Sequence, residues 1–303
     1  MTNLLNKLER ELGQKRVKTE FDLSPYLTLR TKTTAQYYFE AESRADLINA
    51  KRASLNLKLP FLVLGGGSNL AILKRILKGL VVRNKFIYKR IEKRNDHALL
   101  TVSSGYPVTK LAKELAEGGY EGLEYHFGLP GTVGGALYMN SKWTKPHLYV
   151  GDNLVSATLI DQAGGEKKVD RAYFDFAYDQ SKLQKTKEIL LEAVFRLKKA
   201  DPQIVKKHAN FASEYRKKTQ PFGVFTSGCF FKNINGKSAG QLIDQSGLKG
   251  KRIGKFHVSE KHANFIIHEG GGKPEDLKKL LQTIKVRVKK KFGVKLEEEV
   301  IVI

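Results

Sequence analysis

Apolar residues recur along the chain at helical spacing in some segments and in short continuous runs in others. Between residues 274 and 292 they fall every three or four positions, which predicts an amphipathic helix with one buried face. Pro274 lies at the predicted start, Gly293 follows the predicted end, and lysines occupy the last turn, where they suit the helix dipole. The opposite, lysine-rich face of this helix is expected to be solvated.

Helices and strands alternate throughout the chain without a tandem repeat, which predicts a mixed α+β class. Ser43 and Asp46 have the spacing of a capping box, so a helix is expected to begin at Ser43. Further helices are predicted over residues 107–117, 202–218 and 238–246. Strands are predicted in the segments FLVL, GLVV, HALLTVSS, NLVSATLID and KEILLEAVFRL.

The chain is long enough for more than one hydrophobic core. It has 303 residues, of which 41% are hydrophobic, and this allows two or three domains. A first segment that ends with the strand FLVL and its glycine turn runs to about residue 73, and Ala200-Asp201-Pro202 has the composition of a boundary. We therefore expect three segments, 1–73, 74–201 and 202–303.

The formal net charge of +23 would attract polyanions such as nucleic acid, anionic lipid or a phosphorylated small molecule. The basic residues are spread along the chain, which favours a solvated basic surface over nucleic-acid binding as the main function. A single cysteine excludes an intramolecular disulfide, the N-terminus lacks the apolar region of a signal peptide, and no apolar run approaches the ~18 residues of a membrane span. The expectation is a cytoplasmic protein without membrane insertion, and a monomer by default.

Two glycine-rich stretches, LGGGSNL and HFGLPGTVGGALYMN, are the first candidates for chemistry. Three successive glycines in the first let the backbone approach a ligand closely, and the second leads into a predicted helix whose N–H groups suit an anion. Neither is a Walker loop or a G-x-G-x-x-G fingerprint. Together they fit a dinucleotide pyrophosphate held from both sides, and the alternative is two unrelated turns. The candidate cofactor-binding residues are Gly65, Gly66, Gly67, Ser68, Asn69, Leu70, Pro130, Gly131, Thr132, Gly134 and Gly135.

The histidines do not have the spacing of metal ligands. His126, His257, His262 and His268 form no H-x-x-x-H pattern and accompany no cysteine cluster. Structural or substrate-contacting roles are therefore expected, and no metal.

Six ordered stretches resemble the UDP-N-acetylenolpyruvoylglucosamine reductases (MurB) of peptidoglycan synthesis. They are LGGGSNL, GLPGTVGGALYMN, GCFFKN, SAGQLIDQSGLKG, VSEKHANFII and FGVKLEEEV. The resemblance covers residues 25 to 303 and favours the compact subtype, because no long tyrosine-bearing insertion is present. It implies an α+β flavoprotein with the FAD-binding fold of the vanillyl-alcohol-oxidase type in segments 1–73 and 74–201, and a substrate-binding α/β domain over 202–303. It also implies that NADPH reduces the flavin, which then reduces the enolpyruvyl double bond of a UDP-sugar.

By the same resemblance, Cys229 takes the place of a serine that donates a proton to the substrate. A thiol is a stronger acid than an alcohol, yet it starts neutral at neutral pH because the usual pKa of a cysteine is about 8.5. Glu299 matches a glutamate that stabilises the enol intermediate, and Lys217, Lys232 and Asn233 are the candidate substrate-binding residues. The alternatives are a packed cysteine for Cys229, a solvated acidic end for Glu299 and a solvated helix lysine for Lys217.

The resemblance fails at Asp179. The family has a catalytic arginine in a Tyr-Arg-x-Ser motif, and this chain reads YDQS. The aspartate reverses the charge, and losing charge-assisted contacts to a substrate carboxylate slows a reaction by roughly a hundred-fold or more. The segment SKWTKPHLYVG also replaces a run of small residues on the flavin side.

Three explanations of Asp179 are open. The substrate differs, the chain is a weakly active paralogue, or a nearby lysine takes over, the candidates being Lys142, Lys182 and Lys185. The rival functions are another flavin oxidoreductase of the same fold and a non-catalytic basic protein that binds polyanions.

Overall fold

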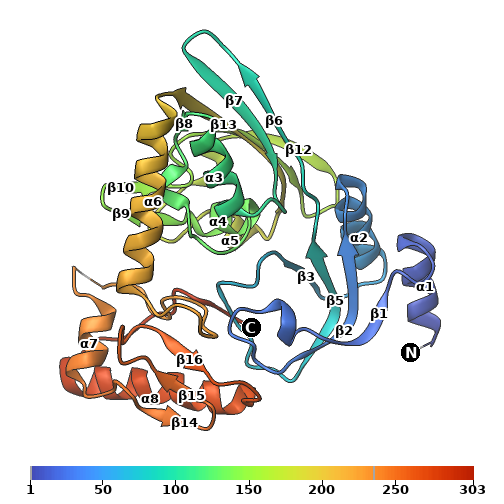
Figure 1. The fold of residues 1–303 in the computed structure, drawn as a ribbon. Coiled ribbons are helices and arrows are strands. Elements are labelled where there is room, and N and C mark those ends of the chain that lie inside the picture. Colours follow the sequence, from blue (N-terminus) through green and yellow to red (C-terminus); the bar gives the residue numbers. More distant parts are fainter. Residues whose placement is uncertain (1, 235) are drawn as a thin grey trace. The chain divides into compact units, whose positions relative to one another are not determined.

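The computed structural model of the protein describes residues 2–234 and 236–303. The chain has two compact units (Figure 1). The first unit comprises Met1–Thr19, Tyr37–Gly66 and Gly79–Arg216, and the second unit comprises Glu20–Gln36, Gly67–Lys78 and Lys217–Ile303. Each unit combines segments that are far apart in sequence, so long-range packing holds each of them together.

The larger sheet of the first unit has the strand order β12-β11-β13-β7-β6 (Figure 1). These strands pair antiparallel, and Ala193 in the central strand lies opposite Val102 on one side and Ala157 on the other. Buried residues of the sheet share one apolar core with helices α3 and α4. The elements are β6 (Lys89–Lys93), β7 (His97–Ser103), β8 (Tyr120–Glu121, beside β13), β11 (Leu154–Ile160), β12 (Glu166–Asp170), β13 (Ile189–Lys199), α3 (Val108–Glu117) and α4 (Val133–Met139).

A second sheet has the order β1-β2-β5-β3. Strand β3 runs parallel to β5, with Leu62 opposite Val81. Leu8 and Leu47 on the two N-terminal helices are fully buried in the same core as Val82. The elements are α1 (Thr2–Leu12), β1 (Lys18–Asp22), β2 (Thr34–Ala41), α2 (Arg44–Asn56), β3 (Phe61–Leu64) and β5 (Ile76–Asn84).

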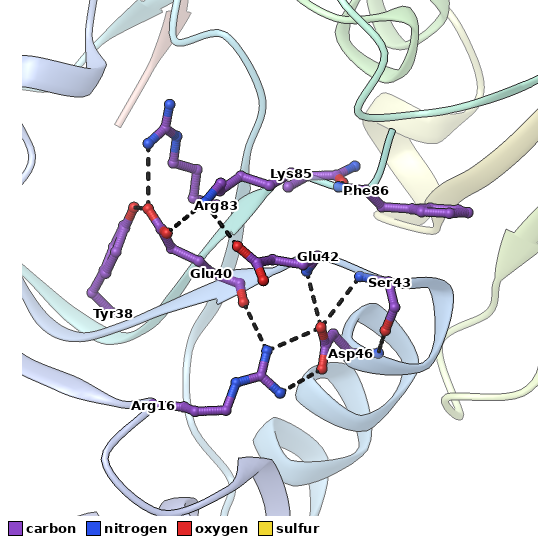
Figure 2. Close-up of polar contacts among 10 residues, drawn as sticks. Arg16, Tyr38, Glu40, Glu42, Ser43, Asp46, Arg83, Lys85 and Phe86 are labelled. Carbon is purple, nitrogen blue, oxygen red and sulfur yellow. Dashed lines mark hydrogen bonds and ion pairs between the residues drawn. The ribbon is translucent and has the colours of Figure 1, made fainter. Parts of the chain in front are cut away.

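Polar contacts secure the start of α2 (Figure 2). The Asp46 N–H donates to Ser43 Oγ (3.1 Å), and the Ser43 N–H donates to the Asp46 carboxylate (3.2 Å), which is the expected capping box. The Arg16 guanidinium donates two further hydrogen bonds to this carboxylate, at 2.8 and 3.0 Å. Burial, the largest single effect, would raise the pKa of the Asp46 carboxyl, but the hydrogen bonds and charge of Arg16 together with the bonds from Glu42 and Ser43 outweigh it, and the pKa lies below its usual value.

A neighbouring group joins β2 to β5 (Figure 2). The Glu40 carboxylate accepts hydrogen bonds from Tyr38 (2.8 Å), Lys85 (2.9 Å) and Arg83 (3.3 Å). Burial would raise the pKa of Glu40, but the bonds from Lys85 and Tyr38 lower it below its usual value. Strand β5 in turn pairs with β3, and the end of β3 leads into Gly65.

The segment SKWTKPHLYVG forms an antiparallel hairpin of β9 (Lys142–Thr144) and β10 (His147–Tyr149). It follows Asn140, which ends α4 in the left-handed conformation (φ 48°). Trp143 pairs with Leu148 across the hairpin and is 3% exposed. The unit also contains α5 (Leu183–Thr186), the short 3₁₀ helices η2 (Glu124–His126) and η3 (Ala172–Phe174), and most of α6 (Pro202–Thr219), whose residues from Lys217 on belong to the second unit.

The second unit has its own core. Leu277, Leu280 and Ile284 of α8 (Pro274–Phe292) are fully buried, as the helical spacing predicts, and Gly293 ends the helix with φ 70°. Figure 1 shows α8 beside a small antiparallel sheet. That sheet has the order β14 (Arg252–Ile253), β15 (Phe256–Val258), β16 (Ile266–His268), and the unit also holds α7 (Ala239–Gln245), η1 (Ser24–Tyr26) and the parallel pair β4 (Leu70–Ala71) and β17 (Ile301–Val302).

The local predictions are confirmed. The expected helices are α2, α3, α6, α7 and α8, and the expected strands are β3, β5, β7, β11 and β13. The roles assigned to segments 1–73, 74–201 and 202–303 stay predictions. Over residues 2–234 and 236–303, no helix is both long enough and apolar enough to cross a membrane.

Candidate functional site

The two glycine loops meet in the first unit. A Cβ on Gly65 would lie 2.6 Å from Thr132 Oγ1, and a Cβ on Gly66 would lie 2.6 Å from the Gly131 Cα. Both contacts are too close for a side chain, so only glycine permits the loops to pack in this way. The sequence-predicted residues Gly65, Gly66, Gly131 and Thr132 are therefore brought together.

The N-terminus of α4 differs from the expectation. The N–H groups of Val133 and Gly134 donate to the carbonyls of Tyr106 (2.9 Å) and Ser104 (2.8 Å), and Thr132 Oγ1 caps Gly135. The expectation that this helix offers unoccupied N–H groups to an anion is therefore wrong, because carbonyls of the segment between β7 and α3 already accept them.

The donors that remain lie in the turns themselves. Among residues 2–234 and 236–303, no protein acceptor pairs with the main-chain N–H groups of Gly66 and Gly131. Two adjacent backbone donors in a surface without side chains suit an oxyanion of a close-packed ligand. Pro130 precedes Gly131, whose φ of 109° a residue with a Cβ rarely adopts.

The other half of the first glycine stretch belongs to the second unit. Gly67 has φ 62°, and a Cβ there would lie 2.2 Å from the Tyr26 carbonyl oxygen. Ser68 and Asn69 lead into Leu70, which starts β4. The Asn69 carbonyl accepts the Ile301 N–H (3.0 Å), so this stretch is bound to the C-terminal strand.

Cys229 and Glu299 come close to each other through backbone pairing in the second unit. Phe230 follows Cys229, and its carbonyl accepts the Glu299 N–H at 2.9 Å. On its other side, Cys229 forms a bridge with Phe265. Cys229 is half-buried and forms no disulfide. A thiol and a carboxylate are thus carried on adjacent, hydrogen-bonded segments.

The surroundings of these two residues are partly apolar. Phe230 and Phe231 are 0% and 1% exposed and belong to the core of the unit. The Asn264 main-chain carbonyl accepts the Phe230 N–H, and the Asn264 side chain bonds both main-chain groups of Phe231. Glu299 is half-buried, whereas Glu297 is exposed. The three C-terminal glutamates are therefore not equivalent surface acids.

The candidate substrate-binding residues differ in exposure. Lys217 is exposed near the end of α6, and its Nζ lies 5.6 Å from the centre of the Phe222 ring. Lys232 is half-buried, and its N–H donates to the Glu297 carbonyl (2.9 Å). The Asn233 side-chain oxygen accepts the Ala239 N–H (3.0 Å), so this side chain supports the start of α7.

Asp179 is buried in the first unit and has a cationic partner. It is 3% exposed, and Lys142 Nζ donates to its Oδ2 at 3.1 Å. The same Nζ lies 3.6 Å from the centre of the Tyr178 ring, which is cation–π distance. Of the three lysines named from the sequence, Lys142 makes this pair, whereas Lys182 Nζ lies over the Tyr173 ring at 4.1 Å.

The histidines have no arrangement suited to a metal. In the described part of the chain, no group of three or more His, Cys, Asp or Glu side chains could hold a metal ion. His268 stacks on Phe256 with 4.3 Å between ring centres, Nδ1 bonds the Leu29 carbonyl (2.7 Å), and Nε2 accepts the Gly272 N–H (2.7 Å). Its role in the second unit is structural.

Sequence reasoning did not single out Arg216. It lies within the basic run EYRKK, where its composition resembles that of its solvated neighbours. The structure places its Nε in a buried position without an acceptor. No signal in the sequence separates it from Lys217 and Lys218.

Residues 35–169 match a family model described as an FAD binding domain, and residues 220–303 match the C-terminal domain of UDP-N-acetylenolpyruvoylglucosamine reductase. Curated relatives with that enzyme name include one from Protochlamydia amoebophila, 36% identical over 88% of this chain and 87% of the relative. Another, from Chlamydia trachomatis serovar L2, is 35% identical over 95% of this chain and 96% of the relative. A crystal structure of the reductase (MurB) from Thermus caldophilus has a TM-score of 0.79 at 30% identity and covers 95% of this chain and 98% of that one.

These matches confirm the predicted fold class, an α+β protein with the FAD-binding fold of the vanillyl-alcohol-oxidase type and a separate C-terminal domain. A glucose oxidase variant of Phl p 4, with a TM-score of 0.52 and 12% identity, shares the fold alone.

Proposed function

The chain belongs to the UDP-N-acetylenolpyruvoylglucosamine reductase family, and we propose that it reduces the enolpyruvyl group of UDP-N-acetylglucosamine enolpyruvate, with FAD and NADPH, in peptidoglycan synthesis. One observation supports the assignment most directly. The Glu299 N–H donates to the carbonyl of Phe230, the residue after Cys229, so the proposed acid and its helper lie on paired segments.

The glycine loops of the first unit fit the FAD pyrophosphate. Gly65, Gly66, Gly131 and Thr132 form a surface without bulky side chains, and the N–H groups of Gly66 and Gly131 have no protein acceptor in the described residues. Bound FAD, reduced by NADPH, would supply the hydride for the substrate. Gly134 and Gly135 are proposed to shape the loop rather than to donate to the ligand, since their N–H groups bond within the protein.

Cys229 is proposed as the proton donor. Reduction of a carbon–carbon double bond adds a hydride to one carbon and a proton to the next, so one protein group must hold a transferable proton. The Cys229 thiol carries that proton on Sγ and becomes a thiolate after the transfer. Its half-buried position beside Phe230 limits contact with water that would otherwise exchange the proton.

Glu299 is proposed to stabilise the charge that develops on the substrate before the proton arrives. The hydrogen bond from the Glu299 N–H to the Phe230 carbonyl holds the Glu299 backbone next to the segment that carries Cys229. Lys217 and Lys232 are proposed to bind the anionic part of the UDP-sugar, and Asn233 to fix the loop that carries Lys232.

Asp179 need not abolish the reaction. Lys142 pairs with Asp179 in the first unit and cancels its negative charge, so the exchange of arginine for aspartate leaves no net negative charge at this position. The paired lysine does not itself replace the cation of the family arginine. A cytoplasmic, monomeric protein remains part of this proposal.

The reaction test uses the full chain with FAD under anaerobic conditions. NADPH should bleach the flavin absorbance, and UDP-N-acetylglucosamine enolpyruvate should restore it in a single turnover. A protein that stays colourless with added FAD, or a reduced flavin that ignores the enolpyruvyl substrate, contradicts the proposal.

Cys229→Ala separates the two half-reactions. NADPH should still bleach the flavin at the wild-type rate, whereas reoxidation by substrate should slow by about a hundred-fold or more, since the proton donor is lost. Cys229→Ser is the matched control, because its hydroxyl can still donate, and it should retain much more of the second step than the alanine variant.

A second candidate, a flavin oxidoreductase with another substrate, is favoured by Asp179 itself, because the family arginine is absent there. That enzyme would reoxidise rapidly with oxygen and would not require the UDP-sugar. The single-turnover test distinguishes the two.

A further inference from the structure

An aromatic cluster lies where η2, the β9–β10 hairpin and α6 meet in the first unit. Tyr125 stacks on Trp143 with 6.1 Å between ring centres and on His208 with 5.3 Å. Trp143 also meets the edges of Phe211 (6.3 Å) and Tyr215 (5.6 Å). These five residues are called the aromatic cluster below, and one of them, His208, has a buried ring nitrogen without a hydrogen-bond partner.

Arg216 is the charged member of this region. Its guanidinium carbon lies 4.8 Å from the centre of the Trp143 ring, and its Nη2 donates to the Tyr125 carbonyl at 3.2 Å. Its buried Nε finds no acceptor, and burial lowers the pKa of the guanidinium to about 10. Among residues 2–234 and 236–303, no carboxylate forms an ion pair with Arg216. Arg216 as a whole is half-buried, but its Nε is out of contact with water, and a cation that is largely desolvated without a counter-ion is unfavourable. Charged groups perturbed in this way cluster at functional sites.

Two imidazoles next to Tyr125 also have a buried nitrogen without a hydrogen-bond partner. His126 is 1% exposed, and its Nδ1 has no hydrogen-bond partner. Burial, followed by the charge of Arg216, lowers the pKa of His126 to about 3, so the ring is neutral. The buried Nδ1 of His208 also lacks a partner. Of the six buried side-chain atoms without partners in the described chain, three thus belong to residues that adjoin, stack on or bond Tyr125.

These unpaired groups match one kind of ligand. An arginine offers only donors, and a neutral imidazole can present an N–H at Nδ1, so the complementary group is an oxygen-rich acceptor with negative charge. The site also adjoins the second glycine stretch, because a Cβ on Gly128 would lie 3.4 Å from both Arg216 Cδ and Ser213 Oγ. The same stretch continues to Gly131, whose N–H is also without a protein acceptor in the described residues.

We propose that Arg216, with His126 and His208, forms a phosphoryl-binding subsite walled by the aromatic cluster. The phosphoryl group comes either from free phosphate compounds or from a nucleotide, whose base can stack on the aromatic side chains. This proposal does not depend on the proposed reductase activity, since a bound phosphoryl group would accept hydrogen bonds from the unpaired nitrogens whether or not a reaction follows. Buried water at these nitrogens is the competing explanation.

The fluorescence of Trp143 can be used to detect binding at this subsite. Trp143 is the only tryptophan and is in cation–π contact with Arg216, so its fluorescence reports a change at the guanidinium. The full-length protein is titrated with inorganic diphosphate, UDP and NADP⁺ in separate arms, without turnover. We expect a saturable change in Trp143 fluorescence with at least one of them, with affinity in the millimolar range or better.

Variants decide whether Arg216 is responsible. Arg216→Gln should raise the dissociation constant about tenfold or more, the equivalent of one charge-assisted contact. Lys207→Gln removes the same charge from an exposed position on α6 and should stay within about twofold of wild type. Should Arg216→Gln fail to fold by circular dichroism, His208→Phe keeps the stacking on Tyr125 and removes the nitrogen. It should weaken binding several-fold.

Each outcome decides the proposal. Binding of all three compounds indicates a general phosphoryl site, and binding of UDP or NADP⁺ without diphosphate assigns the site to that nucleotide. No saturable change with any compound, or equal binding by wild type and Arg216→Gln, overturns it and favours buried water. A chain that fails the flavin test can still pass this titration, so the two proposals fail separately.

Discussion

Asp179 and Arg216 are both charged residues with buried polar atoms in the first unit, but their charge partners differ. Asp179 has an ion pair with Lys142 at 3.1 Å, and the lysine also lies over the Tyr178 ring. Arg216 has a carbonyl and an aromatic face but no anion among the described residues. A buried charge with a partner is a structural feature, whereas one without a partner suggests that the partner is a ligand.

Removing the partner of Asp179 should produce the largest effect. Lys142→Met leaves a buried carboxylate unpaired, and we expect the free energy of unfolding to fall by about 4 kcal/mol. Urea denaturation measures this loss, and Lys168→Met, at an exposed position on β12, is the control. A loss below about 1 kcal/mol, typical of exposed pairs, would remove the contrast between the two sites.

Acidification should destabilise the fold through His126, the buried imidazole beside Arg216. The folded state keeps His126 neutral down to a pKa of about 3, whereas the unfolded chain protonates it below about 6.5, so stability falls as the pH falls through 6.5. At pH 4.5 this amounts to about 3 kcal/mol relative to pH 7.5. Asp46 and Glu40, whose pKa values are lowered, also lose stabilisation in acid, near and below their unfolded pKa values.

The variant His126→Phe isolates this contribution. Asp46 and Glu40 titrate in both proteins, so the difference between the two pH profiles reports His126. Denaturation at a series of pH values should give a flatter profile for the variant above pH 4.5. Parallel profiles would mean that His126 is protonated in the folded state and that its Nδ1 has a partner.

Exchanging the two charges tests whether Asp179 and Lys142 stabilise the fold as a pair. Asp179→Arg alone places two cations side by side, so it should destabilise the fold and should not improve the enzyme. Adding Lys142→Asp restores an opposite pair, and a double-mutant cycle should show a coupling of about 2 kcal/mol. Rescue of reductase activity by Asp179→Arg alone would instead indicate that the charge reversal has no compensation in this chain.

The smallest expected effect is at Arg216. Replacing a half-buried charge that lacks a counter-ion by an apolar residue removes the penalty of taking it out of water, which offsets the lost contacts with Tyr125 and Trp143. Arg216→Met should therefore change the free energy of unfolding by less than about 1 kcal/mol. A loss as large as that of Lys142→Met would show that Arg216 is structural, and the phosphoryl-binding proposal would lose its basis.

The sequence predicted the features that depend on neighbouring residues. The α8 helix follows from the spacing of its apolar side chains, its proline start and its glycine end, and the capping box at Ser43 depends on residues three apart. The ordered motifs likewise indicated the family, because each motif is a short, continuous stretch. Even there, local reasoning overestimated the free donors at α4, since Ser104 and Tyr106 occupy the N–H groups of Gly134 and Val133.

The class, the family and most elements, together with the candidacy of Cys229 and Glu299, could thus be inferred from short stretches of sequence. The lysine that pairs with Asp179 is known from the folded chain alone, because Lys142 lies 37 positions away and reaches it through a hairpin. The folded chain alone also separated Arg216 from the other basic residues of its helix. A charged side chain destabilises the fold or leaves it unaffected according to its burial and its partners. Both depend on segments that are distant in sequence, so neither can be inferred from composition.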